Sequence, residues 1–314
     1  MSVLTLLLTA SLPAQEWKSG VDWQQPPIVT PGASDDQPPS DAIVLFDGSS
    51  LAAFEDGERW KIEEGCAVPQ GTQIVSKQHF GDMQLHVEWA APTTIRGSGQ
   101  GRGNSGIFLM GLYEVQVLDS FENETYFDGQ AGSIYKQTPP MANAMRKPGE
   151  WNTYDIFFTV PRFKVNGDVE RPGFVTLVHN GVLVLNHFEL LGPTSYVEAP
   201  HYQPHAEKGP ISLQFHGDPV RFRNIWVREL KSPIGTRTSA GFHIGKKPKT
   251  DPETKPDSGN HEKEKPKKKS QEAEAKPESG KAGDQSGQQQ PGGGAGQEAV
   301  DAERKTDPIA PARP

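Results

Sequence analysis

The sequence predicts an all-β fold, a two-sheet jelly-roll sandwich followed by a disordered C-terminal tail. Residues 41–230 contain about ten to twelve short runs in which apolar and polar side chains alternate, as they do in half-buried strands. Turn signals such as Asp47-Gly48 separate these runs at intervals of about 8–12 residues. No run has the 3.6-residue period of an amphipathic helix. This pattern is typical of two packed antiparallel sheets.

Two hairpins are marked by their turns. Gly111 and Leu112 join the runs on either side of them, and Asn180-Gly181 stands between two apolar runs. The predicted strands cover residues 43–46, 60–62, 73–76, 83–89, 107–110, 113–118, 151–160, 174–179, 182–185, 211–216 and 220–230.

Outside the strands the chain divides by composition. Residues 1–14 contain a short apolar run, Val3–Leu8, and small residues near Ala14, which resembles a secretory signal without the usual basic start. We therefore expect a secreted or periplasmic protein. Residues 15–40 form a Pro-rich lead-in. Residues 231–314 are mostly Lys, Glu, Pro, Gly, Gln and Ser, a composition that buries too little surface to fold, so this tail should be disordered.

Charge and cysteine content exclude several classes of protein. The tail has a small excess of basic residues, which leaves residues 1–230 with a formal charge of about −11 against −8 for the whole chain. An acidic body disfavours nucleic acid as a partner. Cys66 is the only cysteine, so no internal disulfide forms. No segment is long and apolar enough to cross a membrane, and the oligomeric state stays open.

Three predicted strands each carry a polar pair opposite their core residues. Two interpretations are open: each pair faces water on its own sheet, or the three strands are neighbours and their pairs converge on one hollow. Acids, imidazoles and amides gathered in this way suit a sugar. The three pairs are His86 with Glu88, Glu114 with Gln116, and Gln214 with His216.

Two loops add to this picture. Residues 92–104 contain four glycines, so this loop either approaches a ligand with its backbone or is flexible. Residues 121–150 form a connection too long for an ordinary loop, and its aromatic residues argue for a functional role rather than disorder. Asp119, between strand and loop, is either a turn residue or a group at the mouth of the site.

Several motifs, in order, resemble those of the DUF1080 family, also called the 3-keto-disaccharide hydrolase domain. The resemblance covers about residues 41–230 and implies a concanavalin A-like sandwich. One position departs from the commoner pattern, because Tyr135 is followed by Lys136 rather than glycine. The motifs are L-F-D-G (45–48), F-G-D-M-Q-L-H-V-E-W (80–89), G-N-S-G-I-F-L (103–109), Y-E-V-Q-V-L-D (113–119), G-S-I-Y (132–135), G-E-W-N-T-Y-D-I (149–156), H-N-G-V (179–182), G-P-I-S-L-Q-F-H-G (209–217) and V-R-F-R-N-I-W-V (220–227).

The resemblance implies an enzyme that acts on glycosides oxidised to a ketone at C3. Such a ketone acidifies the C2 proton, so a base can remove it and the group at C1 can leave. The candidates for base, acid or metal ligand are Glu114, His216 and Glu88. A divalent cation such as Mn²⁺, Ca²⁺ or Zn²⁺ would suit these side chains, although no spacing demands one. The candidates for substrate binding are Asn104, Gln116, Asp119, His86, Gln214 and Arg223.

A second class of function uses the same face without catalysis. The alternative is a carbohydrate-binding module whose tail tethers it to a surface or polymer. A structural or adhesive exoprotein is a third hypothesis, supported by the tail alone. No dinucleotide fingerprint, phosphate loop or H-E-x-x-H motif is present.

Overall fold

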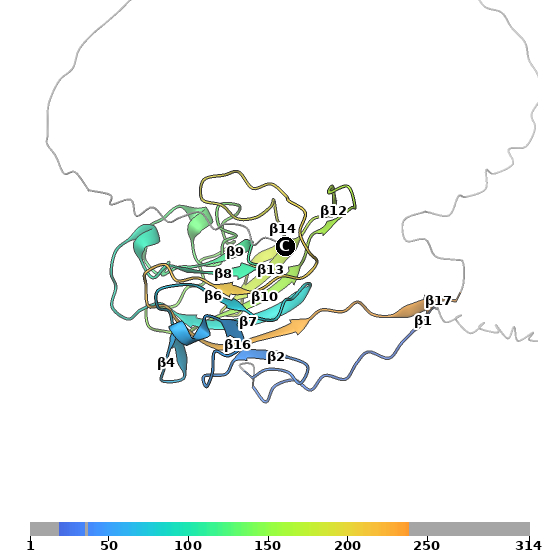
Figure 1. Ribbon diagram of the computed structural model, residues 1–314, viewed down its shortest axis with the longest axis horizontal. Helices are drawn as coiled ribbons and strands as arrows, with labels where there is room; N and C mark the ends of the chain where they lie inside the picture. The colour runs from blue at the N-terminus through green and yellow to red at the C-terminus, as the bar shows by residue number, and fades with distance from the viewer. Residues whose placement is uncertain (1–18, 35–36, 239–314) are drawn as a thin grey trace, which may run out of the picture. The chain divides into compact units, whose positions relative to one another are not determined.

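The computed structural model describes residues 19–34 and 37–238, and within these ranges it contains strands and short 3-10 helices but no α-helix. Two antiparallel sheets face each other. In the view of Figure 1, β8 and β9 of one sheet lie above β7, β16 and β2 of the other. The predicted all-β sandwich is confirmed. No helix in the described ranges has the length and hydrophobicity needed to cross a bilayer.

The larger sheet has eight strands. Its order is β14-β13-β10-β7-β16-β5-β4, and β2 pairs with β16 beside β5. Strands β7 and β10 at its centre pair over seven residues each. Its strands are β2 (Ile43–Phe46), β4 (Lys61–Glu63), β5 (Cys66–Val68), β7 (Met83–Ala90), β10 (Asn152–Thr159), β13 (Phe174–His179), β14 (Val182–Glu189) and β16 (Arg221–Glu229).

The smaller sheet has five strands in the order β3-β6-β15-β8-β9. Its hairpin β8–β9 turns at Met110 and Gly111, which both have positive φ, as a type I′ turn requires. The predicted Asn180-Gly181 turn has the same backbone form. The strands are β3 (Phe54–Glu55), β6 (Ile74–Ser76), β8 (Ser105–Leu109), β9 (Tyr113–Val117) and β15 (Ser212–Leu213).

The remaining elements lie outside these sheets. β1 (Val21–Trp23) pairs with β17 (Gly235–Arg237), and β11 (Arg162–Phe163) pairs with β12 (Val169–Arg171). The 3-10 helices are η1 (Gly57–Arg59), η2 (Gly99–Gly101) and η3 (Phe127–Gly129). β17 lies in the predicted tail, of which residues 231–238 are described. The predicted signal segment (1–14) and residues 239–314 lie outside the described residues.

One hydrophobic core fills the space between the two sheets. Leu85, Val87 and Trp89 of β7 and Val115 of β9 are fully buried and belong to the same cluster. The Tyr154 hydroxyl crosses this core from β10 and donates to the backbone carbonyl of Gln116, at 2.9 Å. Alternation in β7 and β9 therefore points the apolar residues inward, as predicted, and directs the polar residues between them to the two outer faces.

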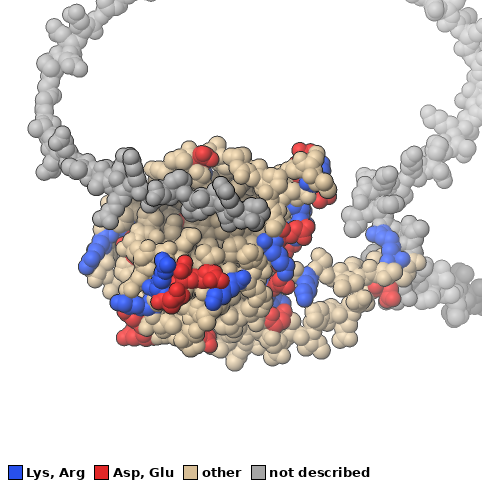
Figure 2. Space-filling model, in the orientation of Figure 1, with Lys and Arg blue, Asp and Glu red and all other residues tan. Residues whose placement is uncertain are grey.

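Acidic and basic side chains are mixed on the face of the body that Figure 2 shows, without an extended basic surface. This agrees with the acidic balance of residues 1–230. The visible face has no positive field of the kind that binds nucleic acid.

Candidate active site

Glu114 lies at the centre of a polar cluster on the outer face of the smaller sheet. Strand register aligns one row of residues across this face, because paired residues share a face. Segment 132–135 extends the sheet beside β9 through the bridge between Val115 and Ile134. The first row is Glu55, Val75, Ser212, Phe108, Glu114 and Tyr135; the second row, next to it, is Gln214, Gly106, Gln116 and Ser133.

The Glu114 carboxyl group is buried without a countercharge. The residue is only 7% exposed, and among the described residues it makes no ion pair. Burial raises its pKa to about 8, because removal from water disfavours the ionised form. At neutral pH the group is therefore mostly protonated. A carboxyl group whose pKa lies near the working pH is suited to exchange protons with a substrate.

The neighbouring amides fit a protonated Glu114. Oε1 of Glu114 lies 3.1 Å from one end of the Gln116 side-chain amide, and the other end lies 3.0 Å from Gln100 Oε1. If Glu114 donates its proton to Gln116 Oε1, Gln116 Nε2 is free to donate to Gln100 and both contacts are satisfied. Asn104, whose Nδ2 donates to the Gln100 carbonyl oxygen at 2.7 Å, completes this amide network. All of Glu114's polar neighbours here are neutral.

Gly106 makes room for the Glu114 carboxyl group. A Cβ added at Gly106 would overlap Glu114 Oε1, whereas a Cβ at Gly101 would meet nothing within 4 Å. We expect Gly106→Ala to lower kcat by at least about tenfold, because the carboxyl group must move away from its partners. Steady-state kinetics measures this, with Gly101→Ala as the matched control. Equal activity of the two variants would show that the carboxyl position is unimportant.

The long connection predicted to be functional packs against β9 and brings two tyrosines to this face. Tyr135 N–H donates to the Glu114 carbonyl oxygen at 3.2 Å, and the Tyr135 and Tyr126 hydroxyl oxygens are 2.6 Å apart. The pKa of Tyr135 is raised by burial, by its bond to Tyr126 and by the nearby charge of Glu114 when ionised. Both hydroxyls therefore keep their protons and can donate them as hydrogen bonds.

Lys136 follows Tyr135 in a left-handed backbone conformation, with φ of 61°. Its ammonium nitrogen lies 3.5 Å from the centre of the Tyr126 ring and 5.6 Å from that of Tyr196. Tyr196 is 73% exposed, so most of its side chain is open to solvent.

Two buried polar atoms in the second row have no hydrogen-bond partner among the described residues. They are Gln214 Oε1 and Ser133 Oγ, on either side of Gln116 and Gly106. Buried polar atoms are usually paired, so unpaired ones call for an explanation such as a ligand or water.

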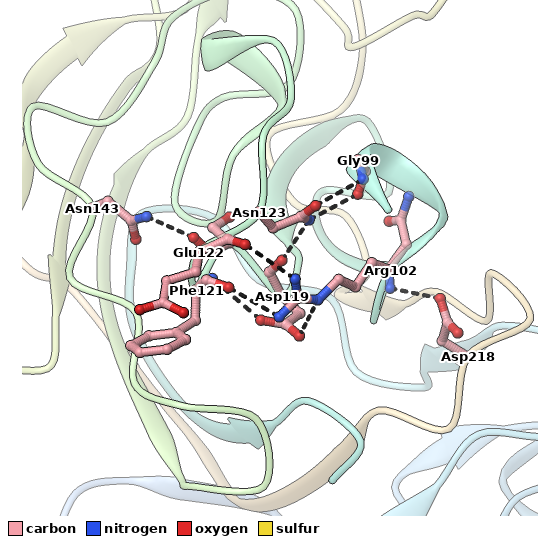
Figure 3. Close-up of polar contacts among 10 residues, drawn as sticks. Gly99, Arg102, Asp119, Phe121, Glu122, Asn123, Asn143 and Asp218 are labelled. Carbon is pink, nitrogen blue, oxygen red and sulfur yellow. Dashed lines mark hydrogen bonds and ion pairs between the residues drawn. The ribbon is translucent and has the colours of Figure 1, made fainter. Parts of the chain in front are cut away.

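Asp119 and the glycine-rich loop form a fixed network at the end of β9 (Figure 3). Arg102 Nε donates to Asp119 Oδ2 at 2.7 Å, and its other nitrogens donate to the carbonyl oxygens of Phe121 and Glu122. Asn123 bonds both backbone groups of Gly99. The loop therefore has a defined conformation, and Asp119 holds Arg102. A cleft of about 390 Å³ opens beside this ion pair, lined also by Arg96, Asp218 and Arg221.

His86 and Glu88 belong to the other sheet, which contradicts the prediction of one shared hollow. Their strand, β7, lies in the larger sheet, whereas β9 and β15 lie in the smaller one with β8 between them. Since the inner faces of both sheets form the core, the pair on β7 and the pair on β9 point out of opposite sides of the sandwich. Alternation identifies the polar face of a strand but not the sheet that the strand joins.

On that opposite face Glu88 is held in a charged network. Arg223 Nε donates to Glu88 Oε2 at 2.6 Å, and Asn224 Nδ2 donates to Oε1 at 2.8 Å. His86 Nδ1 lies 2.8 Å from Asp155 Oδ1. Burial alone would raise the pKa of Glu88 and lower that of His86, but these partners outweigh it and give pKa values of about 2 and about 9. Both side chains are therefore charged and paired at neutral pH, as structural ion pairs are.

The other predicted residues are divided between the two faces. Gln116, Asn104 and Gln214 lie with Glu114. Arg223 lies with Glu88, its guanidinium group 4.0 Å from the centre of the Trp151 ring. His216 is in the exposed segment after β15, and its catalytic role stays a prediction. The segment before β8 and the segment after β15 are joined there, because the Asn104 backbone N–H donates to Asp218 Oδ2 at 2.9 Å.

The divalent cation has no ligand set here. Within the described ranges no three His, Cys, Asp or Glu side chains gather as metal ligands do. The partners of Glu114 are amides and hydroxyls, whereas a divalent cation bound by protein side chains usually takes several carboxylates or imidazoles.

A family model described as the 3-keto-alpha-glucoside-1,2-lyase-like domain matches residues 41–228. The chain belongs to this family. A 3-keto-disaccharide hydrolase of Bacteroides thetaiotaomicron is 24% identical to it over 237 residues, which cover 60% of this chain and 78% of the relative. A crystal structure of a proposed glycosyl hydrolase from Parabacteroides distasonis is 48% identical, with a TM-score of 0.64, and the match covers 69% of this chain and 95% of that one. These findings support a carbohydrate-active function.

This member of the 3-keto-alpha-glucoside-1,2-lyase-like family has residues around Glu114 that the sequence did not assign to the site. Tyr126, Lys136 and Tyr196 come from irregular segments and Gln100 comes from the short 3-10 helix η2, where no periodicity indicates which way a side chain points. The signal available was the aromatic content of residues 121–150, together with Lys136 as a departure from the commoner family motif.

Proposed function

We propose that the protein cleaves 3-keto-glycosides, with Glu114 as the base that removes the C2 proton. The observation that carries this proposal is the buried, unpaired carboxyl group of Glu114, whose pKa of about 8 suits proton transfer near neutral pH. Family membership and the relative named 3-keto-disaccharide hydrolase support the substrate class.

The reaction proceeds in two steps. Ionised Glu114 takes the C2 proton, and the electron pair of the C2–H bond moves to the C3 carbonyl oxygen as an enediolate. The enediolate then forms the C1–C2 double bond and expels the group at C1, whose oxygen takes the proton from Glu114. Addition of water, with OH at C1 and H at C2, gives the free 3-keto sugar and completes a net hydrolysis; without it the reaction ends as an elimination.

The hydrogen-bonded tyrosine pair would hold the charge that develops. One hydroxyl of Tyr126 and Tyr135 donates to the other, which leaves one O–H free to donate to the C3 oxygen. A donor placed at a developing oxyanion lowers the barrier more than any contact made equally in the ground state. The unpaired Gln214 Oε1 would accept a sugar hydroxyl hydrogen bond.

The pH dependence of the reaction tests the role of Glu114. Its pKa of about 8 predicts that kcat/KM rises with pH, with unit slope below about pH 8 and a plateau above it, because only the ionised form accepts the C2 proton. Initial rates between pH 5 and 9.5 would measure the profile. A plateau that already begins near pH 5 would contradict a buried base, and activity that falls through pH 8 would make Glu114 an acid.

The substrate test uses purified protein and a panel of 3-keto-glycosides, with and without a chelator. Release of the aglycone supports the enzyme, and loss of release with chelator would show that a metal ion takes part. The alternative, a carbohydrate-binding module, is favoured only by the exposed ring of Tyr196. Binding of unoxidised glycans without any turnover of the panel would support the module.

Export forms part of the proposal. It rests on the apolar segment before Ala14, which lies outside the described residues. N-terminal sequencing of the mature protein from a fractionated culture tests it: a start near residue 15 in the periplasm or the medium supports export, and an intact N-terminus inside the cell contradicts it.

A further inference from the structure

Lys136 carries a positive charge next to the rings of Tyr126 and Tyr135, and the described residues provide no acidic partner for it. No carboxylate among them lies within 4.0 Å of its ammonium nitrogen, and its contacts are the rings of Tyr126, Tyr135 and Tyr196. The Asp128 carbonyl oxygen accepts the Lys136 backbone N–H at 2.9 Å, but the carboxylate of Asp128 makes no ion pair with the side chain.

The backbone conformation of Lys136 is one that a lysine rarely adopts. A φ of 61° is unfavourable for a residue with a Cβ and favours glycine. Among the described residues, the lysine side chain makes no ion pair that would offset this unfavourable backbone conformation. Its cation–π contact with Tyr126, at 3.5 Å, holds the ammonium group in place and leaves its N–H groups free to donate.

The surroundings keep this charge effective at the site. Tyr135 links it to Glu114, since the two residues are adjacent across the sheet. Glu114 is mostly uncharged below pH 8 and does not neutralise the ammonium group. The rest of the body is acidic, with about −11 over residues 1–230, and offers anions no general attraction. Lys136 is also partly exposed, so a ligand can reach it.

We propose that Lys136 binds an anionic substituent, a carboxylate or a sulfate, on the leaving sugar of the substrate. This inference rests on the proposed function, because it assigns the leaving-group side of the same site. The exposed ring of Tyr196, 5.6 Å from the ammonium nitrogen, would lie against the face of that sugar.

The test compares 3-keto-disaccharides that differ only in the leaving sugar: glucose, glucuronate or glucose 6-sulfate. We expect kcat/KM of the wild type to be about 10- to 100-fold higher for an anionic member than for the neutral one, the range of a hydrogen bond to a charged group. The two anionic members show whether a carboxylate or a sulfate is preferred. The preference should fall as salt is added.

Two variants separate charge from structure. Lys136→Asn removes the charge and tolerates positive φ, so the anionic-to-neutral ratio should fall toward one. Lys136→Arg keeps the charge and should keep most of the ratio. A wild-type ratio near one, or a ratio unchanged in Lys136→Asn, would overturn the inference and leave the cleavage of 3-keto-glycosides standing.

A failure of the proposed function gives a different result. If no member of the set is cleaved, calorimetric binding of unoxidised glucose and glucuronate disaccharides still decides the matter. Tighter binding of the glucuronate disaccharide that is lost in Lys136→Asn supports the inference, and equal binding of the two overturns it.

Discussion

Replacing Glu114 by glutamine is expected to lower kcat by about 10²–10⁴-fold while the protein becomes more stable at alkaline pH. The amide has nearly the same shape but cannot take the C2 proton, and general base catalysis contributes roughly 10²–10⁴-fold. Glu55→Gln is the matched control, because Glu55 is exposed in the same row of the same sheet. Steady-state kinetics on a 3-keto-glycoside measures the loss.

The stability change has a sign that follows from the pKa. Glu114 has a folded-state pKa of about 8, above the ordinary glutamate pKa of 4.5, so the folded protein holds a proton that the unfolded chain loses between these pH values. Stability therefore falls from pH 4.5 to pH 8 on account of this group. Glutamine removes the effect, and the free energy of unfolding should rise relative to wild type by a few kcal/mol at pH 8 and above.

Urea denaturation of both proteins at pH 5 and pH 9 measures this difference. The gain in Glu114→Gln should be small at pH 5 and large at pH 9. A loss of stability at pH 9 would mean that Glu114 is ionised and paired in the folded state. An active Glu114→Gln variant would end the catalytic assignment, whatever its stability.

Replacing Glu88 by glutamine is expected to have the opposite effect: a loss of about 2–4 kcal/mol in stability at pH 7, with kcat per folded molecule nearly unchanged. Breaking one side of a buried ion pair costs about 3–5 kcal/mol. The lower range applies here because the side chain of Arg223 is 42% exposed and solvent screens part of its charge. Urea denaturation measures the loss, and Glu170→Gln, on an exposed strand, should change stability by less than about 0.5 kcal/mol.

The pH dependence of the network provides a second measurement. Glu88, with a folded pKa of about 2, stabilises the protein above pH 4.5, and this contribution is lost as the pH falls toward 2. His86, with a folded pKa of about 9, stabilises it below pH 6.5, and its contribution is lost as the pH rises through 9. The pH-dependent stabilisation by Glu88 and the pH-dependent stabilisation by His86 should both be weaker in Glu88→Gln. A variant with wild-type stability and a kcat reduced by about 10³-fold would instead indicate that Glu88 is a catalytic residue.

The sequence alone predicted most strands of the two sheets and their inward faces, although it missed the short strands β3 and β5. Alternation of period two is a local property, so it correctly predicted that Leu85, Val87 and Val115 enter the core and that His86, Glu88, Glu114 and Gln116 leave it. Turn chemistry was equally local, as the positive φ of Asn180 and Gly181 shows.

Only the tertiary structure decided which polar residues meet. The sheet that a strand joins depends on the packing of the whole core, and this separated Glu88 from Glu114. A register shift in β16, where Asn224 has φ of 45°, turned Asn224 as well as Arg223 toward Glu88. Tyr126 and Lys136 contact Tyr135, the neighbour of Glu114, through an irregular loop, whose side-chain directions follow from long-range contacts rather than from any local repeat.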